Sequence, residues 1–220
     1  MRPRPHGLSL YRSRGHLPTR GGRTLAHRWY NRTVSESERH RLFVAIAVPE
    51  TVARLVADAV EPVRAHAPAA RWTDPTSWHL TLSFLGLVPV ARREEVTGAL
   101  AGVAARHQSF ELRLTGQAGM FGRRVLWAGL TDDGSLHNLA VDVRTALEPL
   151  GFPPDDRPFH PHLTLARARR DTALPKGLDA KYAGPEAGWW VRTLDLMRSH
   201  LSPHGARYEH VARWPLNGLS

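Results

Sequence analysis

The tetrapeptide His-Leu-Thr-Leu occurs twice in this chain, at residues 79–82 and again at residues 162–165. Both copies alternate polar and apolar side chains, which is the pattern of a β-strand with one buried face. Residues i and i+2 of a strand point to the same side, about 6.6 Å apart. Each copy therefore predicts a strand that presents a histidine and a threonine together.

The two predicted pairs are His79 with Thr81 and His162 with Thr164. The apolar side chains of both strands are expected on the opposite face, toward a core: Leu80, Leu82, Phe84, Leu163 and Leu165. A single His-x-Thr on a strand is common and indicates ordinary surface or core. Two copies with the same apolar partners favour a site built on rigid strands.

Two imidazoles and two hydroxyls that meet in one cleft can perform acid–base chemistry on a phosphate. An unperturbed imidazole has a pKa of about 6.5, so one can be neutral while the other is protonated. Each proton transfer is typically worth about 10²- to 10⁴-fold in rate. The hydroxyls of Thr81 and Thr164 can donate to the phosphate oxygens. No metal is needed for this reaction.

The remaining periodicity predicts an α+β fold of two comparable halves. We expect strands at 42–48, 71–73, 79–84, 110–115, 125–130, 162–166, 189–201 and 207–214, and helices at 49–66, 91–107 and 135–150. Pro62 is expected to disturb the end of the first helix. Ser135 is the expected N-cap of the third helix, and Gly151 is expected to end it.

Residues 1–40 differ in composition from the rest of the chain. They contain nine arginines and two glutamates, so they carry +7 of the formal net charge of +10. We predict a basic, disordered extension at 1–40 and a folded domain at 41–220. Alternatively, translation begins at Val34, and peptides from residues 1–33 in a mass spectrum would exclude that. The basic segment favours a polyanion such as RNA, but it is also compatible with a solvated tail.

Two longer segments around the tetrapeptides resemble a known family. Residues 78–86 (Trp-His-Leu-Thr-Leu-Ser-Phe-Leu-Gly) and 159–167 (Phe-His-Pro-His-Leu-Thr-Leu-Ala-Arg) are similar to the paired signatures of the two-histidine phosphoesterases. Within them the sequence resembles the RNA 2′,3′-cyclic phosphodiesterases, also called 2′-5′ RNA ligases. Residues 41–46 and 199–216 support the resemblance, which covers residues 41–216.

The resemblance implies a bilobal α+β fold, with two antiparallel sheets facing across a central cleft and helices on the outside. It implies hydrolysis of RNA 2′,3′-cyclic phosphate ends to 2′-phosphomonoesters, with 2′-5′ ligation as a side activity. His162 would activate water and His79 would protonate the leaving O3′, while Thr81 and Thr164 hold the phosphate.

By the same resemblance, Arg167 contacts phosphate, although an ideal strand would point it to the face opposite His162 unless the strand ends or bulges. His160 makes a His-Pro-His sequence that suggests a metal pair, but no third ligand is near, and we expect a structural role. A further set of aromatic residues is expected either in the core or as a stacking surface for a base: Trp72, Trp78, Phe121 and Trp127.

Other functions stay open at this point. The same site could act on small nucleotides or on a cyclic phosphate derived from ADP-ribose, and a non-catalytic RNA-binding module or a metal hydrolase would also fit. The chain has no cysteine and no apolar run of about 18–20 residues, the length that spans a bilayer. We expect a cytoplasmic monomer without cofactor or metal that acts on RNA ends.

Overall fold

The computed structural model describes residues 38–153, 158–202 and 205–218. Almost all of the extension expected at residues 1–40 therefore lies outside the described residues. Strand β1 (Arg39–Ala47) begins at Arg39, before the domain boundary expected at residue 41. Its centre, from Leu42 to Ile46, is buried on both faces.

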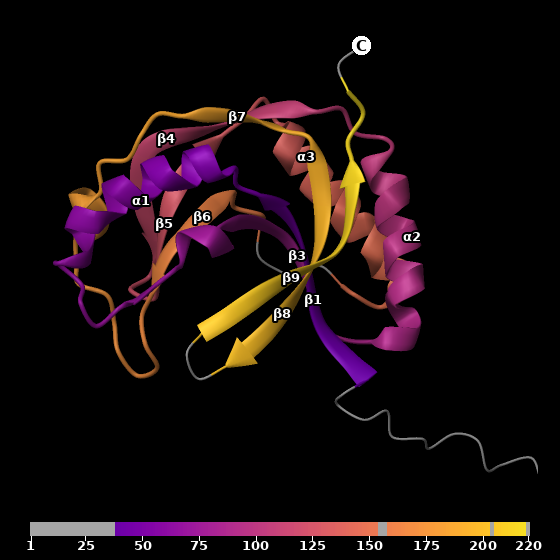
Figure 1. The fold of residues 1–220 in the computed structure, drawn as a ribbon, viewed down its shortest axis with the longest axis horizontal. Helices are drawn as coiled ribbons and strands as arrows, with labels where there is room; N and C mark the ends of the chain where they lie inside the picture. Colours follow the sequence, from indigo (N-terminus) through magenta and orange to yellow (C-terminus); the bar gives the residue numbers. More distant parts are fainter. Residues whose placement is uncertain (1–37, 154–157, 203–204, 219–220) are drawn as a thin grey trace, which may run out of the picture. The chain divides into compact units, whose positions relative to one another are not determined.

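Two antiparallel sheets make up the described unit (Figure 1). The four-stranded sheet has the order β3-β1-β8-β9, with β3 at His79–Pro89, β8 at Thr193–Ser202 and β9 at Gly205–Pro215. The five-stranded sheet has the order β2-β6-β5-β4-β7, with β2 at Arg71–Trp72, β6 at His162–Arg167, β5 at Val125–Thr131, β4 at Phe110–Phe121 and β7 at Gly188–Val191. The α+β class is confirmed, and each sheet contains one copy of the tetrapeptide.

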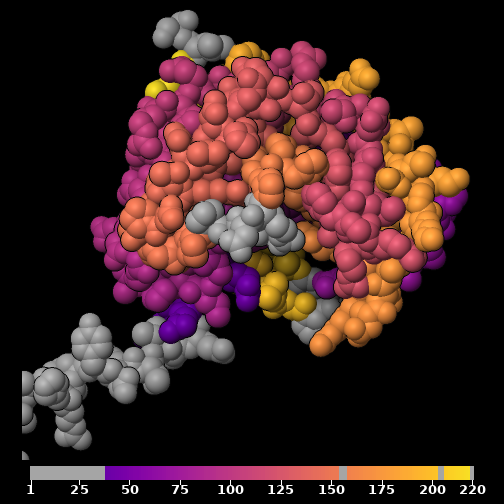
Figure 2. All heavy atoms as spheres, turned by 180° about the vertical axis from the view of Figure 1, so that it is seen from behind, coloured from indigo at the N-terminus to yellow at the C-terminus, as the bar shows by residue number. Residues whose placement is uncertain are grey.

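Three α-helices occur in the described part of the chain: α1 (Glu50–Arg64), α2 (Arg93–Ala104) and α3 (Ser135–Leu147). Helices α2 and α3 lie side by side in both Figure 1 and Figure 2, and they contact strands of the four-stranded sheet. Helix α1 buries a stripe of valines in the core that it shares with β6. None of the helices in the described ranges is long and apolar enough to cross a bilayer.

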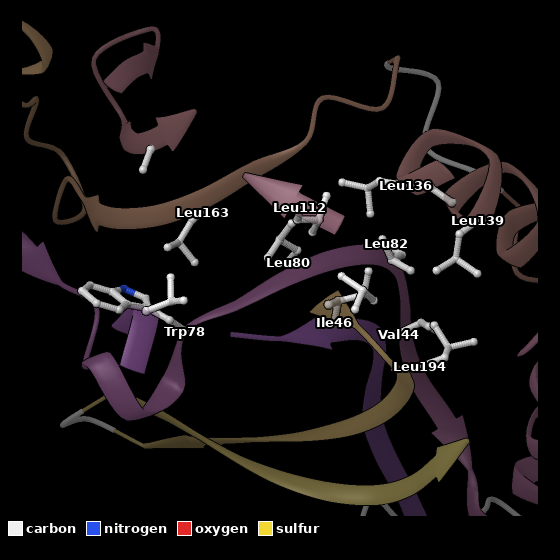
Figure 3. Packing of buried hydrophobic residues seen from close by; sticks show 14 of the residues in the cluster. Val44, Ile46, Trp78, Leu80, Leu82, Leu112, Leu136, Leu139, Leu163 and Leu194 are labelled. Carbon is white, nitrogen blue, oxygen red and sulfur yellow. The ribbon is translucent and has the colours of Figure 1, made fainter. Parts of the chain in front are cut away.

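The apolar faces of both tetrapeptide strands pack into one hydrophobic core (Figure 3). Leu80 and Leu82 of β3 and Leu163 and Leu165 of β6 are each at most 1% exposed and belong to the same cluster. Burial of one such side chain stabilises the fold by about 1.5–3 kcal/mol. The residues between these leucines are therefore held on rigid backbone.

The predicted helix limits needed correction. The second helix is shorter than 91–107, and α1 ends at Arg64, two residues after Pro62 and before the expected residue 66. Ser135 is not the N-cap of α3, because that position is Gly134, and the side chains of Asp132 and Asp133 accept hydrogen bonds from the first backbone N–H groups. Gly151 does end the region, with a left-handed φ of 76° after a 3₁₀ turn.

The strand expected at 189–201 is in fact two strands in different sheets. It breaks at Arg192, so that β7 pairs with β4 while β8 pairs with β1 and β9. The alternating pattern on both sides of Arg192 gave no sign of this change of sheet. The chain therefore passes directly from the five-stranded sheet to the four-stranded sheet at Arg192.

Candidate active site

The register of β3 shows which of its side chains share a face with His79. The pairing with β1 shifts twice, because Ala45 pairs with Thr81 and Val44 with Ser83, and a second shift follows at Phe43. Leu82 is therefore an extra residue, and the alternation changes after it. His79 and Thr81 stay on one face as predicted.

Phe84 was predicted on the core face with Leu80 and Leu82, and this was wrong. The first shift turns Phe84 outward, where it is 72% exposed and its ring lies 6.2 Å from that of Phe43. Phe43 in turn contacts His79. Phe84 therefore lies on the same face as the first histidine.

Strands β3 and β6 contact each other although they belong to different sheets. Leu80 of β3 and Leu163 of β6 belong to the same core cluster, and both are labelled in Figure 3. The side chains that alternate with these leucines point away from the core, and they include His79 and His162. The two histidines are near enough for the charge of His162 to lower the pKa of His79.

Each of the two histidine rings is oriented by a hydrogen bond from Nδ1 to a backbone carbonyl. Nδ1 of His79 donates to the carbonyl oxygen of Ser77 at 2.8 Å, and Nδ1 of His162 donates to that of His160 at 2.7 Å. A carbonyl can only accept, so the proton lies on Nδ1 in the neutral form of each ring. Each Nε2 is then the atom left to take a proton when the ring is neutral, or to give one when it is charged.

Aromatic rings fix the planes of the two imidazoles. His79 lies between Phe43 and Tyr208, with ring centroids at 4.8 and 4.9 Å, and Tyr208 meets it edge-on. His162 meets Phe121 at 4.9 Å with perpendicular planes. Tyr208 comes from β9, so the C-terminal hairpin reaches the first histidine. Sequence reasoning did not assign Phe43 or Tyr208 to the site, although residue 208 lay in a segment that supported the resemblance.

The surroundings lower the pKa of both imidazoles from their usual value. For His79 the main cause is burial, which the hydrogen bond to Ser77 opposes and the positive charges of Arg167 and His162 reinforce. For His162 burial again lowers the pKa most, opposed by the hydrogen bond to the His160 carbonyl, and the charges of His160 and Arg167 lower it further. Both shifts favour the neutral form of the ring relative to a free imidazole.

A bulge in β6 brings Arg167 to the face of His162 and Thr164. Leu126 of β5 pairs with Ala166 and Trp127 pairs with Thr164, so Leu165 has no opposite residue. Leu165 and Ala166 are consequently both buried, and the alternation is reversed after them. The Arg167 guanidinium lies 3.5 Å from the Thr164 hydroxyl. The structural condition for a phosphate contact by Arg167 is thus met.

His160 contributes its carbonyl oxygen to the site, as the acceptor for His162. Its ring packs against Trp127, with centroids 4.7 Å apart, and lies 6.4 Å from the ring of His162. In the described ranges no three His, Cys, Asp or Glu side chains come together in a way that could hold a metal ion. For both histidines the acceptor carbonyl belongs to the residue two positions before the histidine. This shared spacing is the sequence signal that could have identified the two carbonyls.

The four candidate stacking residues have different environments. Trp78 is core, with 4% exposed, and Trp72 donates to the Ala67 carbonyl beneath the guanidinium of Arg64. Phe121 and Trp127, by contrast, lie beside each other and beside His160. Of these four residues, the structure thus brings only Phe121 and Trp127 close to His162.

The chain is similar to known proteins of one family. A family model described as the 2′-5′ RNA ligase superfamily matches residues 48–203. A protein of Escherichia coli K12 named RNA 2′,3′-cyclic phosphodiesterase is 32% identical over 185 residues, which is 82% of this chain and 98% of the relative. A Geobacillus stearothermophilus protein of the same name is 32% identical over 82% of this chain, and the chain spans 59% of that relative's length.

Solved structures give the same result. The crystal structure of E. coli LigT complexed with 3′-AMP has a TM-score of 0.68 and 29% identity, and the match covers 81% of this chain and 99% of LigT. A structure from Thermus thermophilus has a TM-score of 0.67 and 30% identity, with 81% and 98% covered. Two sheets that each present a His-x-Thr strand, in this fold, define a two-histidine phosphoesterase. The chain belongs to the 2′-5′ RNA ligase superfamily.

Proposed function

We propose that this protein hydrolyses the 2′,3′-cyclic phosphate at RNA ends to a 2′-phosphomonoester, with His79 and His162 as its acid–base pair. The observation that carries the proposal is the matched orientation of the two imidazoles, each with Nδ1 bound to a backbone carbonyl. The same protonation pattern leaves Nε2 of both rings for proton transfer. Relatives of this chain are named RNA 2′,3′-cyclic phosphodiesterase.

The reaction needs one neutral and one protonated imidazole. Nε2 of neutral His162 takes a proton from water, and the water oxygen attacks phosphorus. The bond from phosphorus to O3′ breaks, and Nε2–H of protonated His79 gives its proton to O3′. One water is consumed, and the products are a 2′-phosphate and a free 3′-hydroxyl. The next turnover requires the proton to return from His162 to His79 through solvent.

The negative charge of the phosphate is held by Thr81, Thr164 and Arg167 in this proposal. Arg167 supplies the positive charge, and its guanidinium already lies beside the Thr164 hydroxyl. Hydrogen-bond donors that face the phosphate oxygens stabilise the charge that develops on them. Structures of LigT complexed with 3′-AMP and with phosphate are compatible with such a site.

The decisive experiment uses an oligonucleotide that ends in a 2′,3′-cyclic phosphate, incubated with the full chain in EDTA. The expected product carries its phosphate on O2′. A product with phosphate on O3′ would mean that O2′ is the leaving group. Loss of activity in EDTA would indicate a metal hydrolase. Binding without any product would indicate an RNA-binding module.

Competition between substrates separates the remaining alternatives. We expect the RNA end to outcompete small cyclic nucleotides and an ADP-ribose-derived cyclic phosphate. Ligation of RNA ends through a 2′-5′ bond opens the same cyclic phosphate with the 5′-hydroxyl of a second RNA in place of water, and O3′ leaves again. We propose it only as a side activity. A monomeric state and a cytoplasmic location also stay predictions, to be checked by light scattering and cell fractionation.

A further inference from the structure

We infer that Phe121 and Trp127 form a platform on which the nucleobase of the substrate stacks, beside the second histidine. This inference rests on the proposed function, because it concerns the nucleoside that carries the cyclic phosphate. The two rings lie 5.4 Å apart, tilted by 33°, and Phe121 is 39% exposed. Stacking on aromatic side chains is how proteins hold unpaired bases.

Strand register places this platform next to the phosphate-binding residues. Trp127 pairs directly with Thr164, and Phe121 pairs with Val125, which pairs with Arg167. Paired residues point to the same face, so both rings lie on the face of the sheet that carries His162 and Thr164. With strands about 4.8 Å apart, Phe121 lies about 10 Å across the sheet from Arg167. The base and its phosphate would therefore bind on the same face.

The Trp127 ring occupies the space that a side chain on the neighbouring strand would otherwise fill. Gly119 of β4 pairs with Trp127, and a Cβ atom at residue 119 would come within 2.3 Å of the indole. The indole therefore lies across the glycine backbone. The His160 ring also packs against the indole at a steep angle, with ring centroids 4.7 Å apart. A platform that contains a ring held in this way loses little conformational entropy when a base stacks on it.

Other exposed aromatic residues are less suitable. Trp190 of β7 is 43% exposed, but β7 is the strand farthest from β6 among β4 to β7, and Arg192 covers the ring. Phe84 is more exposed and lies on the first-histidine side, where it contacts Phe43. Phe121 is the exposed ring that directly contacts a proposed catalytic imidazole.

The test compares two ligands that differ only in the base. Adenosine 2′,3′-cyclic phosphate and the cyclic phosphate of methyl β-riboside are compared by kcat/KM, and their 2′-phosphate products are compared by Kd. In the wild-type chain we expect the nucleotide to be favoured about 5- to 150-fold, which corresponds to about 1–3 kcal/mol for one stacked base.

Phe121→Ala should lower this ratio to near one in both measurements. Phe121→Leu, which keeps apolar bulk and loses the ring, should do the same and excludes misfolding as the cause. Trp190→Ala is the matched control and should keep the wild-type ratio. A wild-type ratio near one overturns the platform, and so does a ratio that survives Phe121→Ala but is lost in Phe84→Ala.

The two proposals fail in different ways. If the cyclic phosphates are opened without preference for a base, the platform is wrong and the proposed reaction stands. If neither compound is opened but the 2′-phosphate still binds with a preference that depends on Phe121, the reaction is wrong and the platform stands.

Discussion

Replacement of Arg167 by methionine removes its charge while it keeps much of the length of the side chain. In the structure the guanidinium lies 3.5 Å from the Thr164 hydroxyl, on the face of His162. A hydrogen bond to a charged group contributes about 1.5–3 kcal/mol. At about 1.36 kcal/mol per tenfold, Arg167→Met should lower kcat/KM about 10- to 150-fold.

The same substitution should also change the pH profile. The charge of Arg167 lowers the pKa of both His79 and His162. Its removal should therefore raise both values and move both limbs of the kcat/KM profile to higher pH. Burial is the larger cause and is unchanged, so the limbs stay below the position expected for two free imidazoles.

Steady-state cleavage of a cyclic-phosphate-ended oligonucleotide from pH 4.5 to 8.5 measures both effects. Arg169→Met is the matched control, because Arg169 donates to the Ala69 carbonyl and has no place in the site. Wild-type kcat/KM in Arg167→Met would exclude a phosphate contact by the guanidinium, and limbs that move to lower pH would exclude its effect on the two imidazoles.

Three further outcomes are expected. Thr164→Val removes one hydroxyl at nearly constant shape and should lower kcat/KM about 10- to 100-fold, measured with the same oligonucleotide, whereas unchanged kinetics would exclude a phosphate contact. The base must be neutral and the acid protonated, so two lowered imidazole pKa values place the maximum of the wild-type kcat/KM profile below about pH 6.5; a maximum above pH 7.5 would contradict this. Arg213→Met leaves the 1% exposed carboxylate of Asp195 without its two hydrogen bonds and should lower the free energy of unfolding by about 3 kcal/mol in urea, whereas Arg54→Met, in an exposed pair, should change it by less than about 1 kcal/mol.

The tetrapeptides predicted much of the site because strand alternation is local. His79, Thr81, His162 and Thr164 lie on the faces that the period of two required. The α+β class followed from the same periodicity. These features depend on which residues are apolar, and the sequence states that directly.

Features that depend on register could not be predicted in this way. The bulge at Leu165 reverses the face of Arg167, and the shift after Thr81 turns Phe84 outward. Both result from pairing with strands distant in sequence, and no local pattern marks them. The contact of Tyr208 with His79 arises likewise from the tertiary arrangement of the C-terminal hairpin.

The capping of α3 shows a competition that residue preferences did not resolve. Ser135 is a favourable N-cap residue, yet Asp132 and Asp133 offer carboxylates to the same N–H groups, and Gly134 adopts a φ of 96° that suits glycine. The helix therefore begins at Ser135 itself. The change of sheet at Arg192 was hidden for a similar reason, since both flanking segments favour strands.

Two imidazoles act on one phosphorus in the proposed reaction, and single-turnover cleavage by His79→Ala and by His162→Ala shows whether both are required. With saturating protein and EDTA present, each variant should open the cyclic phosphate at least about 10²-fold more slowly than the wild type, because each loses one proton transfer. Near-normal turnover in either variant would contradict the acid–base pair.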